Sequence, residues 1–363
     1  MPFDFVVNQA TVARSAPGRS RVVNQHTWQG LVRTYLILGR SSIAWAHALP
    51  VALWIDPAAP AYTSILILIW STLFYFISCR INDLADLSSD SVNPARSSSP
   101  LVTGTVPTLR ATYWTLVELI VLLGTVSLAP ISSISQVLAS AAIALTIYGN
   151  TFQKTSSTLA PLVMDALYGS TMILILIGSR TIVGSAVEPS AVLVMLSYGA
   201  SVMLLNLVSG NLKDIDTDRF VGARTTAIEL GVARTPDGRF AFTAKYLITV
   251  GIVQGIAAVA LTASCVMTAE FNILTIFLAA LAISAAIAAS VILVRHLKEL
   301  ARSPLESSRI RRPTSSLLML AAFLLATGLH VEWQVFLIPT AGALAIYVGQ
   351  KLIRRDEDLL QTG

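Results

Sequence analysis

The sequence has little charge for its length. Asp, Glu, Lys and Arg make up only 12% of the 363 residues, whereas 54% are hydrophobic. A soluble domain carries about 25% charged residues, and long apolar runs are typical of membrane-spanning helices. The mean hydropathy of +0.70 agrees with the membrane class. The composition therefore excludes an ordinary soluble enzyme and predicts a chain that crosses the bilayer several times.

Cysteine is also scarce, since the chain has only Cys79 and Cys265, both inside apolar runs. Two such residues provide no zinc or iron–sulfur spacing, and they favour buried thiols over a disulfide. The net charge of +5 comes from basic residues that are dispersed over loops. This pattern indicates contact with anionic lipid headgroups and gives no support to nucleic-acid binding. Nothing in the sequence implies an obligate protein partner.

Ten apolar runs are visible, and most reach the roughly 20 residues that a helix needs to cross a bilayer. Because lipid offers the backbone no hydrogen-bond partners, such runs must be helical. The last two runs are interrupted by His330 and Glu332, so they form either two crossings or one crossing and an interfacial helix. The runs cover residues 32–56, 60–81, 110–129, 131–150, 158–180, 187–210, 241–267, 271–295, 314–329 and 333–350.

Lys and Arg are unevenly distributed among the predicted loops. They concentrate after the second, fourth, sixth and eighth runs, and Arg180 is the exception in the other loops. Positive loops stay in the cytosol, so we expect the N-terminus to face it, in the endoplasmic reticulum membrane of a eukaryotic host. Residues 1–31 are polar and lack the apolar core of a signal peptide. We expect a cytosolic tail (1–31), a transmembrane domain (32–350) and a polar C-terminal tail (351–363).

Two acidic clusters lie at the ends of apolar runs on this cytosolic side. The first reads NDLADLSSD from residue 82, and the second reads NLKDIDTD from residue 211. On a helix, spacings of i, i+4, i+8 and of i, i+3, i+7 each place side chains on one face. The residues so placed are Asn82, Asp86 and Asp90 in the first cluster, and Asn211, Asp214 and Asp218 in the second.

Crowded carboxylates repel one another and resist leaving water, so a positive charge must offset their repulsion. Mg²⁺ does this well, because it takes a few carboxylate oxygens, keeps several waters and uses its remaining positions on phosphate. Two clusters that face each other in a membrane predict a site for a diphosphate whose tail lies in apolar surroundings. The alternative, two solvated helix ends, explains a single cluster but explains two at matching positions poorly.

The motifs resemble those of the UbiA superfamily of intramembrane prenyltransferases. The first cluster fits the NDxxDxxxD motif of that family, and Asp214 with Asp218 resembles its DxxxD motif. The stretch from Asp218 to Thr225 is similar to the family's D-R-x-x-G-x-R-T run. Less specific matches are Arg40, Pro100, Gly104, Tyr148 and Lys154.

The resemblance implies an all-α, polytopic membrane bundle, typically of nine transmembrane helices, around a central cavity. It also implies a prenyl diphosphate substrate, bound through Mg²⁺ at the cytosolic mouth. The residues expected to hold the metal are Asp83, Asp86, Asp90, Asp214 and Asp218. The catalytic set is expected to be Asp83, Asp86, Asp214, Asp218 and Tyr148. Expected substrate-binding residues are Arg40, His47, Asn82, Lys154, Asn211, Lys213 and Arg224.

Some of these residues have a second interpretation. Lys213 and Arg224 also serve the positive-inside rule, and His47 also fits a satisfied intramembrane polar group. Asn206, within a span, could line the cavity. Aromatic faces can stabilise an allylic cation, although each candidate also fits a packing role. The candidates are Trp45, Phe74, Tyr75, Tyr148, Phe152, Tyr168 and Tyr198.

Three fates of the cation separate the functional hypotheses: capture by an aromatic acceptor, capture by the chain's own alkenes, or binding and transport without chemistry. Members with aromatic acceptors usually have arginine before Pro100 and a Lys-Arg pair after the fourth helix. Here these positions hold Ser99 and Lys154-Thr155. The departures favour a diverged, specialised enzyme. The chain resembles fungal membrane-bound cyclases of the bergamotene synthase type, and this resemblance implies a cyclase that converts farnesyl diphosphate to a sesquiterpene. The alternative is a prenyltransferase. A transporter should show broken helices at mid-membrane, and Gly or Pro interruptions in the spans are sparse.

Overall fold

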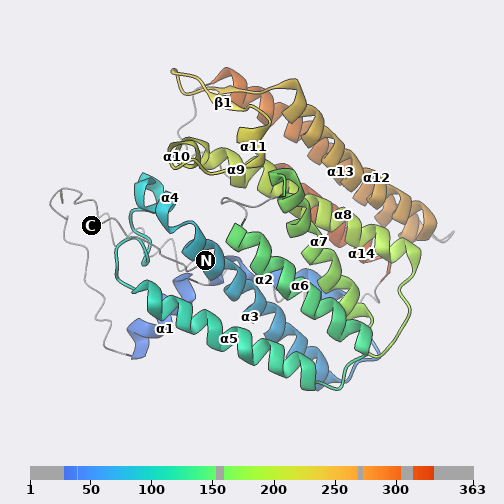
Figure 1. Cartoon of the computed structure of the whole chain (residues 1–363). Helices are drawn as coiled ribbons and strands as arrows, with labels where there is room; N and C mark the ends of the chain where they lie inside the picture. Colours follow the sequence, from blue (N-terminus) through green and yellow to red (C-terminus); the bar gives the residue numbers. More distant parts are fainter. Residues whose placement is uncertain (1–27, 39, 153–158, 269–272, 304–313, 331–363) are drawn as a thin grey trace, which may run out of the picture.

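The computed structural model of the protein describes residues 28–38, 40–152, 159–268, 273–303 and 314–330, which form a bundle of long helices (Figure 1). Lys154 and the last apolar run, 333–350, lie outside the described residues. The choice between one and two final crossings therefore stays a prediction. Its elements are α1 (Trp28–Leu38), α2 (Ser41–Leu53), α3 (Ala61–Ala85), α4 (Leu87–Val92), η1 (Pro94–Arg96), α5 (Thr108–Leu128), α6 (Ser133–Phe152), α7 (Pro161–Arg180), α8 (Pro189–Leu205), η2 (Asn206–Gly210), α9 (Asn211–Lys213), α10 (Ile215–Phe220), α11 (Thr226–Glu229), β1 (Ala233–Arg234), β2 (Phe240–Ala241), α12 (Ala244–Thr268), α13 (Ile273–Arg302) and α14 (Thr314–Thr327).

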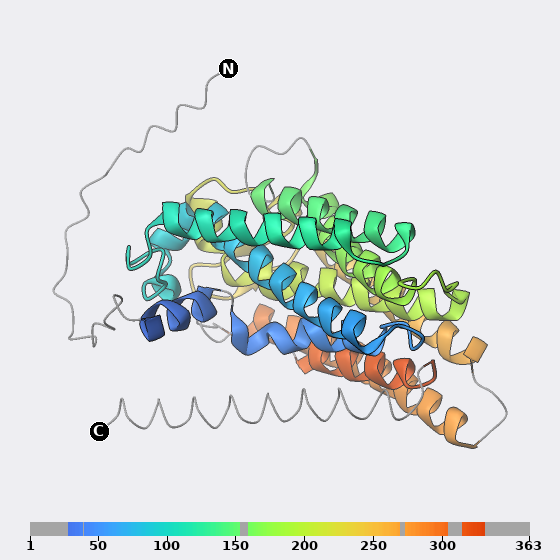
Figure 2. The same ribbon diagram turned by 90° about the horizontal axis from the view of Figure 1, so that it is seen from below.

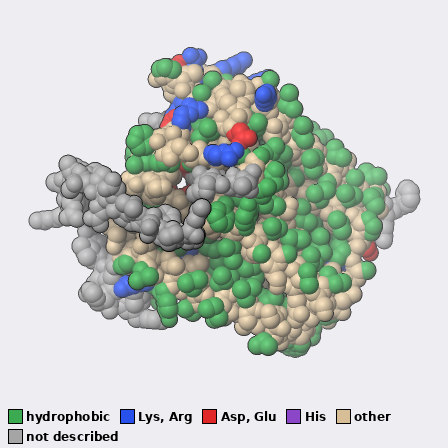
Figure 3. All heavy atoms as spheres, viewed as in Figure 1, with side chains coloured by type: hydrophobic (Ala, Val, Ile, Leu, Met, Phe, Trp, Pro, Cys, Tyr) green, Lys and Arg blue, Asp and Glu red, His purple; other side chains and the backbone are tan. Residues whose placement is uncertain are grey.

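The predicted all-α membrane class is confirmed. In the described part of the chain, six helices are long and apolar enough to cross a bilayer. They are α3, α5, α7, α8 with its continuation to Lys213, α12 and α13. The strands β1 and β2 form a small antiparallel hairpin that pairs Ala233 with Ala241. Hydrophobic side chains cover much of the face seen in Figure 3, and most charged side chains visible on that face gather near α10 and the hairpin.

The first apolar run is not one continuous helix, as the sequence suggested, because the chain breaks between α1 and α2. Arg40 begins α2 with a left-handed backbone, φ 48° and ψ 45°. This conformation is uncommon for residues other than glycine. The Arg40 N–H donates a hydrogen bond of 3.0 Å to the Ile37 carbonyl, which closes the turn. The break changes the direction of the chain at Arg40.

Neighbouring helices pack side by side around one large apolar core (Figure 2), and a second, smaller core joins Leu38 to Leu101, Val106 and Ala111. The most extensive contacts join α8 to α12, α13 to α14, α6 to α7 and α7 to α8. At the crossing of α7 and α8, a side chain on Gly169 would overlap the Gly199 carbonyl, and one on Gly199 would overlap Ile173. Small residues at such crossings let helix backbones approach closely. The second half of the bundle is thereby held tightly against α7.

The two ends of the bundle differ. The connections at one end are joined by backbone hydrogen bonds, from Ser132 N–H to Ile182 O (2.8 Å) and from Asp56 N–H to Ser179 O (3.1 Å). The opposite end carries α4, α9 and α10 (Figure 1). Both acidic clusters belong to that second end, which we call the polar end.

Candidate functional site at the polar end of the bundle

The first acidic cluster lies where α3 passes into α4. The sequence spacing predicts one uninterrupted helix, but the structure ends α3 at Ala85 and begins α4 at Leu87, with Asp86 between them at φ −86° and ψ 1°. Backbone hydrogen bonds still link Asp86 N–H to Asn82 O (2.9 Å) and Asp90 N–H to Asp86 O (2.8 Å). Aspartate favours helix ends over helix interiors, because its side chain competes for backbone groups.

The second cluster repeats this arrangement. A short π-helix, η2, leads into α9, and Asp214 (φ −107°, ψ 8°) separates α9 from α10. The Asp218 N–H donates a hydrogen bond of 2.8 Å to the Asp214 carbonyl, as Asp90 does to Asp86. π-Helical turns are rare and often occur at functional sites. Each cluster therefore has an aspartate at a helix break and another aspartate one turn later.

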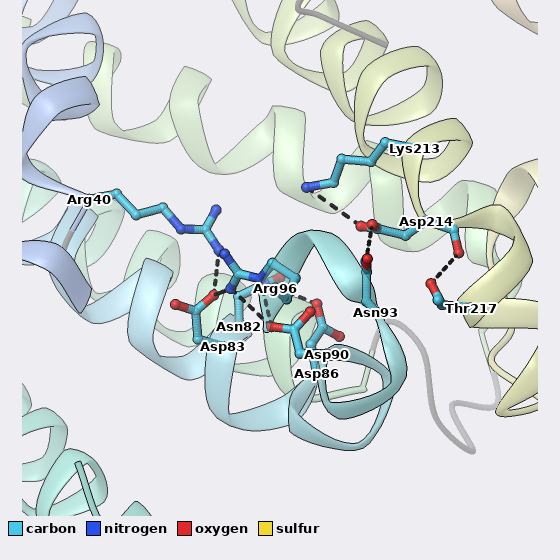
Figure 4. Close-up of polar contacts among 10 residues, drawn as sticks. All are labelled: Arg40, Asn82, Asp83, Asp86, Asp90, Asn93, Arg96, Lys213, Asp214 and Thr217. Atoms are coloured by element: carbon cyan, nitrogen blue, oxygen red, sulfur yellow. Dashed lines mark hydrogen bonds and ion pairs between the residues drawn. The ribbon is translucent and has the colours of Figure 1, made fainter. Parts of the chain in front are cut away.

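The structure brings the two clusters together. Helix α4 contacts α10, and the side-chain amide of Asn93 donates a hydrogen bond of 3.0 Å to Asp214 Oδ1 (Figure 4). Lys213 Nζ lies 3.5 Å from the other oxygen of Asp214. Asp218, from the same cluster, is fully buried. Sequence reasoning missed Asn93, although it stands three residues beyond Asp90 and seven beyond Asp86, a spacing that fits the same helix face.

Two arginines compensate the charge of the first cluster. Arg96 Nη2 lies 2.7 Å from Asp83 Oδ1, and Arg96 Nε donates a hydrogen bond of 2.9 Å to Asp90 Oδ2 (Figure 4). Arg40 forms a further ion pair with the same oxygen of Asp83. Asp83 is only 4% exposed, and a buried carboxylate is costly without such partners. Burial raises the pKa of the Asp90 carboxyl, and the Arg96 guanidinium opposes part of that shift.

Arg96 is the second residue that sequence reasoning missed as a member of the site. It lies in the basic loop after the second apolar run, three residues before Ser99, the position where members with aromatic acceptors usually have arginine. The loop therefore presents one guanidinium to the acidic cluster, although Ser99 and not arginine stands next to Pro100. A basic residue close to an acidic motif was the available signal.

Asn82 and Arg224, both predicted to bind substrate, have partners in different places. Asn82 donates a hydrogen bond of 3.1 Å to Asp86 Oδ2, within the first cluster. Arg224 instead lies in an exposed pair with Glu229, with 3.4 Å between Nη2 and Oε2. Its predicted role toward a substrate stays a prediction.

Aromatic side chains surround His47 below the first cluster. The buried imidazole stacks on Phe74 and lies against Tyr75, with ring centroids 5.7 and 5.5 Å apart. Tyr148 packs on Phe152 at the end of α6 at 5.2 Å, and both belong to the predicted aromatic set. Tyr198 is buried and packs on Phe323 at 4.5 Å, whereas Tyr168 is exposed.

An apolar cavity of about 70 Å³ lies between α3, α5, α6 and α7, toward the end of the bundle opposite the acidic clusters, since its lining also includes Ser179 and Ile182. Its lining includes Ile67, Ser71 and Phe74 from α3 and Gly178 from α7. Phe74 precedes Asp83 by nine residues, which at 1.5 Å per residue places it roughly 13 Å along the helix from that carboxylate. Because Phe74 also stacks on His47, the aromatic group connects the polar end to the apolar interior.

A further buried carboxylate, Asp165 on α7, is the largest omission of the sequence reasoning. It is 1% exposed and accepts hydrogen bonds from Asn206, Asn211 and Thr226. An acidic residue within an apolar run signals a functional or structural role, and this signal was present in the run 158–180. Asn206 and Asn211, both predicted to face the site, are thus partners of Asp165.

The donor set of the two clusters fits magnesium chemically. It consists of carboxylate and amide oxygens, which are hard ligands of the kind that Mg²⁺ prefers. Within the described ranges, however, no group of three or more Asp, Glu, His or Cys side chains converges on one point. Three of these carboxylates already have partners from the protein. Arginines form ion pairs with Asp83 and Asp90, while Asn93 and Lys213 contact Asp214.

The fold and the paired clusters define an integral membrane helical bundle with a polar, acidic site at one end. The UbiA prenyltransferase family matches residues 41–302, and the chain belongs to this family. No curated protein sequence matches the chain.

Solved structures of the same fold are similar to the chain. A UbiA homolog from Archaeoglobus fulgidus bound to GPP and Mg²⁺ is 20% identical, with a TM-score of 0.58, covering 81% of this chain and 99% of that one. A structure described as digeranylgeranylglyceryl phosphate synthase is 17% identical, with a TM-score of 0.56 and coverage of 82% and 98%. An apo UbiA homolog from Aeropyrum pernix K1 is 19% identical, with a TM-score of 0.52 and coverage of 81% and 95%. At these identities the likeness establishes the fold alone.

Proposed function

We propose that the protein is a membrane-bound class I terpene cyclase that acts on a prenyl diphosphate, farnesyl diphosphate in particular. The carrying observation is that two acidic clusters meet at one end of an apolar bundle, joined by the hydrogen bond from Asn93 to Asp214. The site offers oxygen ligands for a metal–diphosphate at its polar end and apolar surroundings for a hydrocarbon tail. Relatives of the same fold bound to GPP or DMAPP with Mg²⁺ support the choice of substrate class.

The residues that would hold Mg²⁺ are Asp83, Asp86, Asp90, Asp214 and Asp218, with the Asn82 and Asn211 side chains beside them. Bound there, the metal would neutralise negative charge on the diphosphate and make it a better leaving group. Positively charged side chains of the protein already lie beside these carboxylates. Arg40 and Arg96 contact Asp83, and Lys213 lies beside Asp214. Each can donate charge-assisted hydrogen bonds to phosphate oxygens when a diphosphate enters.

The apolar interior would then control the cation. When the carbon–oxygen bond breaks, the electron pair leaves with the diphosphate, and an allylic cation remains on the tail. Water must be excluded, because it would capture the cation as an alcohol. Buried Phe74, half-buried Tyr75 and the His47 ring present aromatic faces near the polar end, and such faces stabilise cations. Ring closure by an alkene of the same chain, followed by loss of a proton, gives a hydrocarbon.

The choice of cyclization over transfer rests on the sequence departures. Ser99 replaces the arginine before Pro100, and Thr155 replaces the second residue of the Lys-Arg pair. The second candidate is a prenyltransferase that moves the prenyl group to a small acceptor. It is favoured by the family description and by the similarity to digeranylgeranylglyceryl phosphate synthase. The positive-inside pattern further supports a cytosolic mouth, in the endoplasmic reticulum membrane if the host is eukaryotic.

The test is an incubation of membranes that contain the protein with farnesyl diphosphate and Mg²⁺ but without any acceptor. Gas chromatography of the headspace is expected to detect a sesquiterpene hydrocarbon. Membranes that carry an Asp86→Ala variant are the matched control. If product forms only after a phenolic acceptor is added, the protein is a transferase and the cyclase proposal is wrong.

A further inference from the structure

Asp165 connects helix α7 to the part of the chain that carries the second acidic cluster. Its Oδ1 accepts a hydrogen bond of 2.6 Å from the Asn206 amide. Its Oδ2 accepts one of 3.2 Å from the Asn211 amide and one of 2.5 Å from the Thr226 hydroxyl. The carboxylate is 1% exposed and lies on α7, one turn beyond the start of the helix.

The three donors come from three different elements. Asn206 begins the π-helix η2, Asn211 begins α9, and Thr226 begins α11. Asn211 and Thr226 flank the segment that contains Asp214 and Asp218. A single buried carboxylate therefore holds both ends of this segment against the neighbouring helix.

Asp165 also fixes which way the two amides point. The Asn206 and Asn211 side chains both present their NH₂ groups to the carboxylate oxygens of Asp165, which accept the hydrogen bonds. Their carbonyl oxygens consequently face away from Asp165. The Asn206 oxygen lies against Gly210, where any side chain would overlap it. On the other side of η2, the Tyr246 hydroxyl donates a hydrogen bond of 3.0 Å to the Leu207 carbonyl.

We propose that Asp165 is a positioning residue, which orders the segment from Asn206 to Thr226 and sets the direction of the Asn211 amide. Its importance for metal binding rests on the proposed function, but the restraint on the chain does not. An amide could not replace it, because asparagine would present an NH₂ group to neighbours that are themselves donors. Groups that orient metal ligands from behind typically change metal affinity when they are replaced.

Hydrogen exchange of the purified full-length protein, without Mg²⁺, tests the restraint directly. In Asp165→Asn, amides in residues 206–226 are expected to exchange faster than in the wild type, whereas residues 82–96 stay unchanged. Asp56→Asn is the matched control, because Asp56 is also a buried aspartate, 3% exposed, but lies at the opposite end of the bundle. Unchanged exchange over 206–226 in Asp165→Asn would overturn the proposal.

Reversal of one hydrogen bond separates positioning from a general loss of structure. The double variant Asp165→Asn with Asn206→Asp exchanges donor and acceptor between α7 and η2, and it is expected to restore part of the protection. If Asp165→Asn does not fold, Thr226→Val keeps the carboxylate and removes one donor. Faster exchange near residue 226 is then expected, and no change there contradicts the proposal.

A Mg²⁺ titration measures the effect on the site. Thermal unfolding is followed in the presence of farnesyl thiolodiphosphate, an unreactive analogue, while Mg²⁺ is varied. The half-saturating Mg²⁺ concentration of Asp165→Asn is expected to rise about tenfold, with a smaller loss of kcat at saturating Mg²⁺. An unchanged midpoint overturns the link to the metal site. If the wild type shows no Mg²⁺-dependent shift, the proposed function fails, while the exchange result still decides the positioning role.

Discussion

The side-chain amide of Asn93 donates a 3.0 Å hydrogen bond to Asp214, 121 residues further along the chain. This bond joins the loop after the first acidic cluster to the helix break in the second. Helices α4 and α10, which carry the last aspartates of the two clusters, Asp90 and Asp218, are also in contact. The bundle thus positions two distant pieces of sequence as one polar surface above an apolar interior.

The aspartates at the two helix breaks are expected to be essential for turnover. Asp86→Ala and Asp214→Ala should each lower product formation by roughly 100-fold or more, because each removes a ligand that stabilises charge on the departing diphosphate. Headspace chromatography measures the product, and circular dichroism with a thermal scan checks that the helices are retained. Product at the wild-type level from either variant, with the bundle intact, would refute the assignment.

Arg96 is expected to stabilise the protein most when no metal is present. Arg96→Ala leaves Asp83 and Asp90 with fewer partners, and its loss should destabilise the metal-free protein by about 1–2 kcal/mol, since Arg96 is partly exposed. Mg²⁺ with an unreactive diphosphate analogue should reduce this difference, because the metal supplies positive charge to the same carboxylates.

Thermal unfolding with and without the Mg²⁺–analogue pair measures the effect of Arg96. Arg239→Ala is the control, because Arg239 forms an exposed pair with Asp237 on the β1–β2 hairpin. An equal loss of stability for Arg96→Ala in both conditions would show that Arg96 does not share ligands with the metal.

The apolar cavity is expected to influence the length of the tail that the protein accepts. Ser71→Leu adds apolar volume to the cavity wall and should lower kcat/KM for the fifteen-carbon substrate relative to the ten-carbon one by about tenfold. Ile65→Phe is the control, since Ile65 is 58% exposed on the same helix, α3. Competition between the two substrates gives the ratio, and an unchanged ratio would place the tail elsewhere.

Removal of Mg²⁺ is expected to stop turnover and leave the bundle folded. The carboxylates keep protein partners without metal, as Asp83 does with Arg40 and Arg96, so no isolated buried charge is created. Turnover and the unfolding temperature are measured before and after chelation, and again after Mg²⁺ is restored. Persistent turnover, or unfolding on chelation, would contradict this expectation.

The sequence was sufficient for the fold class and for the location of both clusters. Long apolar runs allow few structures other than helices, because lipid cannot satisfy the backbone. Helical spacing could not reveal the breaks at Asp86 and Asp214, where hydrogen bonds continue at the next turn although the backbone angles change. Such breaks depend on local competition between side chains and backbone.

The pairing of distant polar groups was also beyond local patterns. Asn93 and Arg96 stand just outside the motif, and their partners become clear only when α4 and η1 fold back. Asp165 differs, because a lone carboxylate in an apolar run is a local signal. Its partners, Asn206 and Thr226, lie on elements that only the packing of α7 against α8 brings near.

The hydrogen bonds from Ser132 to Ile182 and from Asp56 to Ser179 tie together the connections opposite the acidic site. A hydrocarbon made inside the bundle would have no affinity for the charged mouth, and these tied connections stand between it and the other side of the membrane. Such a product would instead leave into the surrounding lipid by passing laterally between helices. Product release would then be the partitioning of the hydrocarbon from the protein into lipid. The choice of detergent or bilayer should therefore alter the turnover rate even where the rate of the chemical step is unchanged.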